Sequence, residues 1–515
     1  MHRALLIGLV CLPAAAMVSA GESKPQSPNV LIVMCDQLTA GVMSTYGGPV
    51  PTPHVDRLAR EGVRFTQAIC PTPFCSPTRA SMITGMYPHA HGIVVNCRQG
   101  AVSTGPPGIM AKDVTTEKLL SEAGYATHHY GKWHLSGDRL PYYPDMYPVE
   151  GKYLDEMKDT FDKVRRTPRS DWMDWYVWPL PVEIAPAIRE AQSAVGEAWK
   201  EKRFADFILK IGRLKLPLEQ VYDVRVAQLT ADRVRSLAGQ REPFMITCSF
   251  NGPHDPNVVP NPYYDQVDPA GIRLPDNHGI REERFEKDWS RKIVEGIKEP
   301  GLREFLRIYY ANVRMLDDQV GRVLAALDAA GVADDTIVVF TADHGDMAGG
   351  HGMVWKSTSA FYDEIARVPL IIRYPRKLKP QSSDLTTDLT DLMPTLLELL
   401  DRPIPSHVQG QSMVPFLTGR RDPAQGRRYA FSERVKASPE GTRRLEKGTT
   451  GSFMIRGQGW KFIRYSHGPD KQYLYHLTDD PGEVRNLAND PAYAGKVKEL
   501  SGEIDAWLER TGWPK

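Results

Sequence analysis

A cysteine followed closely by an arginine is the most distinctive chemical pattern in the sequence. The run Cys75-Ser76-Pro77-Thr78-Arg79 opens a stretch of good helix formers that ends near Gly85, and proline is common in the first turn of a helix. We therefore predict that Cys75 lies at a helix N-terminus, where free backbone N–H groups favour an anion. Arg79, one turn further on, can turn back toward Cys75 and hold a tetrahedral oxyanion by a forked contact.

Two further pairs of polar residues follow apolar, strand-like runs. Asp36-Gln37 comes after residues 30–34, and Asp343-His344 comes after residues 336–340. Oxygen-rich pairs of this kind suit a hard divalent cation. In an open α/β sheet the ligand site lies beyond the carboxyl ends of the strands. Asp36, Lys132, His254 and Asp343 each follow such a run, so we expect these four side chains to converge.

The elements that must position these residues alternate between short apolar runs and longer amphipathic ones. This alternation is typical of βαβ units, so we predict an α/β fold with a large, mostly parallel sheet flanked by helices. Beyond Gly419 the pattern changes to a basic loop and short aromatic strands, which predicts a small C-terminal α+β subdomain. The expected strands are 30–34, 126–130, 243–250, 336–340, 368–373, 460–465 and 473–477, and the expected helices are 115–123 and 302–327.

The segment around Cys75 resembles the signature of the formylglycine-dependent, arylsulfatase-like sulfatases of the alkaline phosphatase superfamily, and it matches at every fixed position. In that family the cysteine is oxidised to formylglycine, whose hydrate is the nucleophile. Later motifs follow in the family's order, with Tyr130 as a departure that we expect to affect packing only. They are Gly131-Lys132-Trp133-His134, Pro253-His254-Asp255-Pro256, Thr341-Ala342-Asp343-His344-Gly345, Lys356 and the C-terminal Tyr475-His476-Leu477.

The resemblance implies a role for each matching residue. Arg79 would orient the formylglycine hydrate, Asp343 would accept its proton, and Lys132 would bind the sulfuryl oxygens. His254 and Lys356 would protonate or screen the leaving oxygen, and His134 would deprotonate the second hydroxyl so that sulfate is expelled. The metal ligands implied by the family are Asp36, Gln37, Cys75, Asp343 and His344.

Two of these metal positions depart from the commonest family pattern. Many members carry Asp-Asp and Asp-Asn where this chain has Asp36-Gln37 and Asp343-His344. The changes lower the negative charge around the ion and add a nitrogen ligand, which keeps manganese open as an alternative to calcium. We expect one divalent cation, calcium.

Composition and sequence features further limit location and partners. The 515 residues carry 64 Lys and Arg against 63 Asp and Glu, so there is no positive excess to suggest a nucleic-acid partner. Residues 1–20 have the pattern of a cleavable signal peptide, and no later run is apolar enough for a membrane span. We expect an exported protein, periplasmic or secreted. Six cysteines are too few for a disulfide scaffold, and pairing among Cys35, Cys70, Cys97 and Cys248 is left open.

We predict a catalytic domain at 21–425 and a C-terminal subdomain at 426–515, with an insertion at 138–221 that could shape the substrate site. Trp172, Trp175 and Trp178 in this insertion could stack on sugars, although packing is the more common role of such a cluster.

The expected function is hydrolysis of sulfate esters on a sulfated small molecule or glycan, after maturation by a formylglycine-generating enzyme. The alternatives are a phosphonate monoester or phosphodiester hydrolase of the same superfamily, which the pair Lys132 and His134 disfavours, and an inactive glycan-binding relative.

Overall fold

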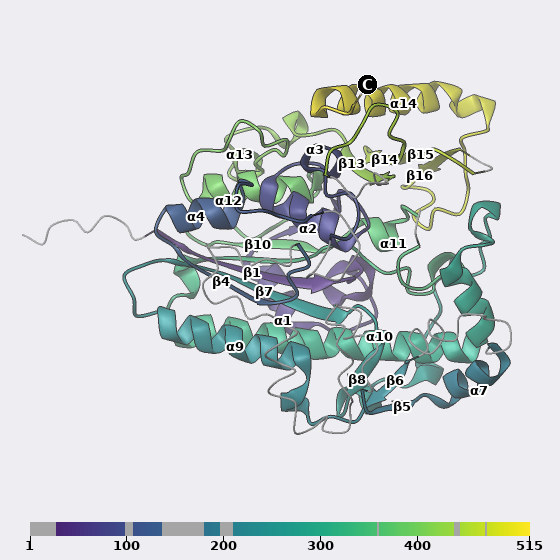
Figure 1. The fold of residues 1–515 in the computed structure, drawn as a ribbon, viewed down its shortest axis with the longest axis horizontal. Coiled ribbons are helices and arrows are strands. Elements are labelled where there is room, and N and C mark those ends of the chain that lie inside the picture. Colours follow the sequence, from purple (N-terminus) through teal and green to yellow (C-terminus); the bar gives the residue numbers. More distant parts are fainter. Residues whose placement is uncertain are drawn as a thin grey trace, which may run out of the picture.

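The computed structural model describes residues 27–97, 107–135, 180–195, 210–357, 360–436, 443–468 and 471–514. The predicted signal peptide at 1–20 and the tryptophans Trp172, Trp175 and Trp178 lie outside this part of the chain. Its architecture is a large central sheet covered by helices on both faces, with a second sheet and the C-terminal helix packed to one side (Figure 1).

The central sheet has seven strands in the order β11-β2-β10-β9-β1-β7-β4. Strand β1 runs parallel to both of its neighbours, and only β10 is antiparallel to the strands beside it. The prediction of a large, mostly parallel sheet is therefore confirmed. Its strands are β1 (Asn29–Asp36), β2 (Val63–Phe65), β4 (Ala126–Gly131), β7 (Phe244–Pro253), β9 (Thr336–Ala342), β10 (Leu370–Arg373) and β11 (Gln381–Ser383).

The helices form two layers that sandwich this sheet (Figure 1). One layer contains α9 (Tyr222–Leu237) and α10 (Trp289–Ala329), and the other contains α2 (Cys75–Thr84), α4 (Thr116–Glu122) and α12 (Leu392–Leu399). The remaining helices are α1 (Pro53–Glu61), α3 (Pro88–His91), α7 (Pro186–Val195), α11 (Asp363–Ala366), α13 (Val414–Leu417) and α14 (Ala494–Thr511).

Helix α10 begins well before the predicted start at residue 302. Its backbone leaves the helical conformation at Lys298, and Pro300 follows inside the helix. Proline removes a backbone donor and disfavours helix at the preceding residue, so the sequence pattern favours a boundary here. The structure has this break, so α10 consists of two helical segments, and the predicted helix at 302–327 falls in the second. Ile293 and Ile297 on the first segment pack into the same core.

The second sheet is antiparallel and has the order β13-β14-β15-β16. Helix α14 packs on it through Leu500, Ile504 and Trp507. The predicted strands 460–465 and 473–477 correspond to β15 and β16, and the predicted boundary at 425 falls shortly before β13. Its strands are β13 (Ala430–Val435), β14 (Gly451–Gly457), β15 (Trp460–Arg464) and β16 (Gln472–His476).

Two smaller sheets complete the structure. Strands β5 (Val182–Ile184), β6 (Gly212–Leu214) and β8 (Val258–Pro260) form one of them, so part of the predicted insertion contributes strands beside α10. The other pairs β3 (Ala68–Ile69) with β12 (Thr387–Asp388). In the part of the chain that the structure describes, no helix is long and apolar enough to cross a membrane.

Candidate active site

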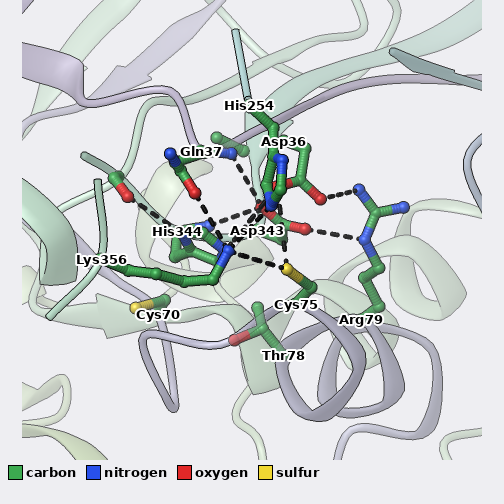
Figure 2. Close-up of polar contacts among 12 residues, drawn as sticks. Asp36, Gln37, Cys70, Cys75, Thr78, Arg79, His254, Asp343, His344 and Lys356 are labelled. Atoms are coloured by element: carbon green, nitrogen blue, oxygen red, sulfur yellow. Dashed lines mark hydrogen bonds and ion pairs between the residues drawn. The ribbon is translucent and has the colours of Figure 1, made fainter. Parts of the chain in front are cut away.

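The carboxyl ends of the central strands bring four potential ligands into one buried cluster. Asp36 is the last residue of β1, Asp343 and His344 follow β9, and Cys75 begins α2. One ligand atom from each of these four residues lies within 4.8 Å of the others. The close-up in Figure 2 shows them pointing toward a common centre. Of the four side chains predicted to converge, Asp36 and Asp343 lie in this cluster, and Lys132 Nζ and His254 Nε2 lie 2.8 Å and 3.8 Å from carboxylate oxygens of Asp36.

Arg79 binds both carboxylates of this cluster. Its Nε donates to Asp343 Oδ2 at 2.7 Å and its Nη2 donates to Asp36 Oδ2 at 3.0 Å (Figure 2). Nη1 donates to the Lys132 carbonyl at 2.7 Å and to Ser249 Oγ at 3.0 Å. We expected the forked contact of Arg79 to hold a tetrahedral oxyanion directly. In the structure that contact is made to the two aspartates, because the guanidinium is only 1% exposed and is enclosed between them.

His344 is held so that one ring nitrogen faces the cluster. Its Nδ1 lies 2.9 Å from the carbonyl oxygen of Gly345, which only a protonated nitrogen can donate to. Nε2 is then the unprotonated nitrogen, and it lies 3.2 Å from Cys75 Sγ and 3.7 Å from Asp36 Oδ1. Burial lowers the pKa of His344. A neutral imidazole with a lone pair aimed at neighbouring ligands is the form that binds a metal.

Gln37 turns its side chain into the site from a left-handed backbone conformation, with φ of 64°. Its Nε2 donates to Asp346 Oδ2 at 2.8 Å, which leaves Oε1 to accept from Lys356 Nζ at 3.0 Å. Its backbone N–H donates to Asp343 Oδ1 at 3.2 Å. Non-glycine residues in this conformation cost energy and concentrate at functional sites. The amide oxygen of Gln37 is thereby oriented toward the cluster.

Lys356 and His254 form a close pair above Cys75. Lys356 Nζ lies 2.9 Å from His254 Nε2 and 3.6 Å from Cys75 Sγ (Figure 2). Burial would lower the pKa of Lys356, but Cys75 and Asp36 raise it. Burial and the positive charge of Lys132 hold the pKa of His254 well below its usual range. The proton between Lys356 Nζ and His254 Nε2 therefore resides on the lysine, and His254 Nε2 accepts the hydrogen bond.

Lys132 and His134 come from the end of β4. Lys132 Nζ lies 2.8 Å from Asp36 Oδ2 and remains 11% exposed, so it lies at the wall of the site. Burial would raise the pKa of Asp36, but Lys132, His254 and Arg79 together hold it well below the usual range. His134 is buried and has a left-handed backbone with φ of 56°. Burial and Lys132 hold its pKa well below the usual range, so its imidazole is neutral.

The Cys75 side chain is a protonated thiol in this environment. Burial, reinforced by the negative charge of Asp36, raises its pKa to about 11. Helix α2 places Cys75 at its first turn as predicted, with Phe74 as the residue before the helix. The five cysteines that the structure describes, Cys35, Cys70, Cys75, Cys97 and Cys248, are all buried and free, so the pairing left open above is not formed among them.

Sequence reasoning missed two residues that position this site. Asp346 orients the Gln37 amide and also accepts the backbone N–H groups of Ala348 and Trp355. Ser249, which is fully buried on β7, accepts a hydrogen bond from Arg79 Nη1. Asp346 lies shortly after Asp343 in the sequence, in the loop that follows β9. Its closeness in sequence to a predicted metal ligand could therefore have identified it. No sequence signal identified Ser249, because a serine inside an apolar strand does not indicate which residue it will bind.

The donor set fits a divalent cation. Asp36 and Asp343 supply carboxylate oxygens, Gln37 an amide oxygen and His344 a neutral nitrogen, and these suit calcium or manganese. A second group, His54 with Asp317 and Asp318, is less suited to a metal, because the side chains of His54 and Asp318 are each 44% exposed, whereas all four residues around Cys75 are buried. Among the described residues the cluster around Cys75 is therefore the site suited to a metal.

The fold and the site together define a hydrolase of the alkaline phosphatase superfamily. Residues 28–402 match the sulfatase family, and residues 349–510 match the C-terminal region of N-sulphoglucosamine sulphohydrolase. The chain belongs to the sulfatase family and is a sulfuric ester hydrolase. The resemblance carried by the sequence motifs is thus confirmed.

Relatives align along almost the whole chain. An N-acetylglucosamine-6-O-sulfatase of Bacteroides thetaiotaomicron is 28% identical, over 96% of this chain and 89% of that protein. The solved structure of a 2-O GAG sulfatase has a TM-score of 0.70 and 26% identity, covering 94% of this chain and 92% of the other. A phosphonate monoester hydrolase from Silicibacter pomeroyi shares the fold, with a TM-score of 0.72, 23% identity and coverage of 94% and 96%.

Proposed function

We propose that this sulfatase uses formylglycine made from Cys75 and one divalent cation, calcium rather than manganese, to hydrolyse sulfate esters of a carbohydrate. The observation that supports this most is the position of Cys75 Sγ, 3.2 Å from His344 Nε2 and 3.8 Å from Asp36 Oδ1, at the start of α2. A reactive group at the position of Cys75 Sγ would lie next to the metal ligands and at the entrance of the site.

The cation and the formylglycine would supply chemistry that the unmodified chain lacks. A divalent cation held by Asp36, Gln37, Asp343 and His344 would withdraw charge from an oxygen bound to it. Hydrated formylglycine carries two hydroxyls on one carbon, so one can attack sulfur and the other can later release the sulfate. The maturation partner is a formylglycine-generating enzyme. The buried, protonated thiol of Cys75 would be a weak nucleophile without this change.

The chain's own residues then bind and move protons. Arg79 fixes Asp36 and Asp343 at their positions, and Asp343, which belongs to the same cluster as Cys75, would accept the proton of the group at position 75. Lys132, partly exposed beside Asp36, offers a positive charge to the sulfuryl oxygens. Lys356 holds a proton at Nζ for the leaving oxygen, and His254 accepts from the same atom. His134, neutral and buried, is a base for the second hydroxyl.

A carbohydrate substrate is supported by the relatives that align along the whole chain. The names of two of them specify sulfate at the 6-position of N-acetylglucosamine and at the 2-position of glycosaminoglycan units. Both are O-sulfate esters of sugars. We therefore propose a sulfated sugar as the substrate.

A phosphonate monoester or phosphodiester hydrolase is the second candidate. Gln37 and His344 favour it, since these variants resemble those enzymes, and the fold is shared. Lys132 and His134 argue against it, because the Gly131-Lys132-Trp133-His134 run keeps a Lys-x-His pair that phosphonate-cleaving relatives tend to lose. An inactive glycan-binding relative is disfavoured because the nucleophile position and the metal ligands are all present.

We also propose that the protein is exported to the periplasm or secreted. The support is the sequence of residues 1–20, with Arg3 before an apolar run and Val18-Ser19-Ala20 as a cleavage pattern. N-terminal sequencing of the mature protein from its host should begin at Gly21, and an intact Met1 on the mature protein would contradict export by this route.

Two measurements on protein made in its own host test the function. The mass of the peptide containing Cys75 should correspond to an aldehyde, and an unmodified thiol in fully active protein would contradict the mechanism. Hydrolysis of 4-nitrophenyl sulfate should exceed that of a 4-nitrophenyl phosphonate in kcat/KM, and the reverse order would support the second candidate. Cys75→Ala should abolish both while keeping the melting temperature.

A further inference from the structure

The loop that carries Lys356 must be held firmly against the loop that carries His254. Between β9 and Lys356 the chain is irregular apart from a short turn at Gly350–Gly352. Lys356 reaches His254 Nε2, at 2.9 Å, through a flexible four-carbon side chain (Figure 2). A flexible side chain on an irregular loop does not by itself fix the distance from Nζ to a second loop. Other contacts must therefore set the spacing of the two loops.

Trp355, the residue before Lys356, is bonded to the loop that carries His254. Its indole Nε1 donates to Asn257 Oδ1 at 2.7 Å. Asn257 follows His254 by three residues and lies between β7 and β8. Trp355 and Asn257 are only 2% and 1% exposed. A hydrogen bond between buried groups is stronger than one in water, so this bond joins the two loops closely.

The backbone of Trp355 is fixed on its own loop. Its N–H donates to Asp346 Oδ1 at 2.9 Å, and its carbonyl accepts from the N–H of Met347 at 2.9 Å. The indole stacks on Trp289, with 5.5 Å between the ring centres. The backbone is left-handed, with φ of 55°. For a bulky residue this conformation costs energy and persists only where the surroundings impose it. These contacts therefore determine where Lys356 begins.

Asp346 extends the connection to the candidate metal site. Its Oδ2 accepts from Gln37 Nε2 at 2.8 Å, while its Oδ1 accepts the N–H of Trp355. Gln37 Oε1 in turn accepts from Lys356 Nζ at 3.0 Å. These residues form a closed ring of contacts, and the bond from Trp355 to Asn257 attaches that ring to the loop after β7. Loss of this bond would let the two loops shift relative to each other.

Building on the proposed sulfatase function, we propose that Trp355 is a positioning residue for the proton transfer to the leaving oxygen. Through its hydrogen bond to Asn257, it holds Lys356 Nζ at a fixed place beside His254. Trp355 acts through Lys356 and takes no direct part in the chemistry. Small displacements of a reacting group cost large factors in rate. Loss of the bond should therefore slow most the substrates whose leaving oxygen most needs a proton.

The test measures how the rate depends on the leaving group, with a series of phenyl sulfates from 4-nitrophenyl to 4-methoxyphenyl sulfate. The logarithm of kcat/KM, plotted against the pKa of the leaving phenol, gives a slope that becomes steeper when proton donation is lost. Trp355→Phe keeps an aromatic ring and removes the Nε1–H donor. We expect kcat/KM to fall about tenfold for 4-methoxyphenyl sulfate and less than about threefold for 4-nitrophenyl sulfate, because a displaced general acid loses part of its contribution. Lys356→Ala should steepen the slope further.

A double-mutant cycle attributes the effect to the hydrogen bond. Asn257→Leu removes the acceptor and should steepen the slope as Trp355→Phe does. The double variant should have about the same slope as either single variant, because all three lack the same bond. Tyr263→Phe is the matched control, since it removes an aromatic donor from Asp318 Oδ2 at 2.7 Å, outside the site, and it should keep the wild-type slope. The slope does not depend on how much enzyme is folded, because one preparation hydrolyses every substrate.

The outcomes separate this inference from the proposed function. Equal losses across the series in Trp355→Phe and Asn257→Leu, or slope changes that add in the double variant, overturn the positioning role and leave the sulfatase function standing. A steeper slope in Tyr263→Phe also overturns it, because the effect would then be a general loss of rigidity. An unchanged slope in Lys356→Ala removes the proton donor on which the role depends. A wild type with formylglycine at position 75 that hydrolyses none of the phenyl sulfates contradicts the proposed function as well.

Discussion

Lys356 Nζ lies 2.9 Å from His254 Nε2, and the hydrogen bond from His254 Nδ1 to the Asp255 carbonyl at 2.9 Å assigns the proton of the pair to the lysine. The two residues are far apart in sequence and come from the loop after β7 and the loop after β9. Their contact places a proton donor, not a second base, above Cys75.

Lys356→Ala should therefore slow substrates in proportion to how much their leaving oxygen needs a proton. We expect kcat to fall by about 100-fold or more for a sugar or alkyl sulfate. The loss should be clearly smaller for 4-nitrophenyl sulfate, whose leaving oxygen is stable without a proton. Steady-state kinetics on both substrates checks this, with Lys436→Ala as the matched control. Equal losses on both substrates would show that Lys356 acts on the sulfuryl group instead.

Arg79→Lys should lose activity while keeping the charge. A single ammonium cannot bridge Asp343 Oδ2 and Asp36 Oδ2 as the fork does at 2.7 and 3.0 Å, so the two carboxylates would shift. We expect kcat/KM to fall by about 100-fold, the cost of a displacement near 1 Å at the reacting centre. Arg79→Met, which leaves the carboxylates unpaired, should in addition lower the free energy of unfolding by roughly 3 to 5 kcal/mol. A lysine variant with wild-type kinetics would refute the positioning role.

Removal of the metal should lower both activity and melting temperature, because ligand binding to the folded state stabilises it. Elemental analysis of the purified protein should find one divalent ion per chain. His344→Asn replaces a nitrogen with an oxygen ligand, so it should increase the preference for calcium over manganese, measured by calorimetry. Asp318→Asn in the other acidic group should leave the metal content unchanged. An unchanged metal preference in His344→Asn, or a loss of metal in Asp318→Asn, would place the ion elsewhere.

Stability should depend on pH through Asp317, which caps α1 by accepting the backbone N–H groups of Val55 at 2.8 Å and His54 at 3.2 Å. Burial raises its pKa to about 6, above the value of about 4 in an unfolded chain. The folded state then holds this proton more tightly, so its contribution to stability is present below pH 4 and is lost as pH rises toward 6. Asp317→Asn does not titrate.

The free energy of unfolding of Asp317→Asn, relative to that of the wild type, should therefore rise between pH 4 and pH 6.5. The expected rise is about 2 kcal/mol, because the pKa of Asp317 differs by about two units between the folded and the unfolded chain. Thermal melting of both proteins at several pH values measures this difference. Asp328→Asn, on the exposed surface of α10, provides the control and should show no such trend. A constant difference across the range would mean that the Asp317 pKa is not raised.

Most of the central fold could be predicted from the alternation of apolar and amphipathic runs. The strands at 30–34, 126–130, 243–250 and 336–340 all appear in the sheet, because a parallel strand buried on both faces leaves a continuous apolar run in the sequence. The break at Lys298, just before Pro300, agrees with the predicted helix at 302–327, whereas the helical segment of α10 before this break was not predicted.

The residue types of the site were also determined by the sequence alone: a cysteine at a helix start, acidic and amide residues after strands, and basic residues in a fixed order. Their partners were decided only by the tertiary structure. The sequence suggested that Arg79 would bind an anion, and folding enclosed it between Asp36 and Asp343. The approach of Arg434, on β13, to Phe74, before α2, likewise joins segments far apart in the sequence. Side-chain types and backbone periodicity are local properties of a chain, whereas hydrogen-bond partners, protonation and burial depend on which distant segments pack together.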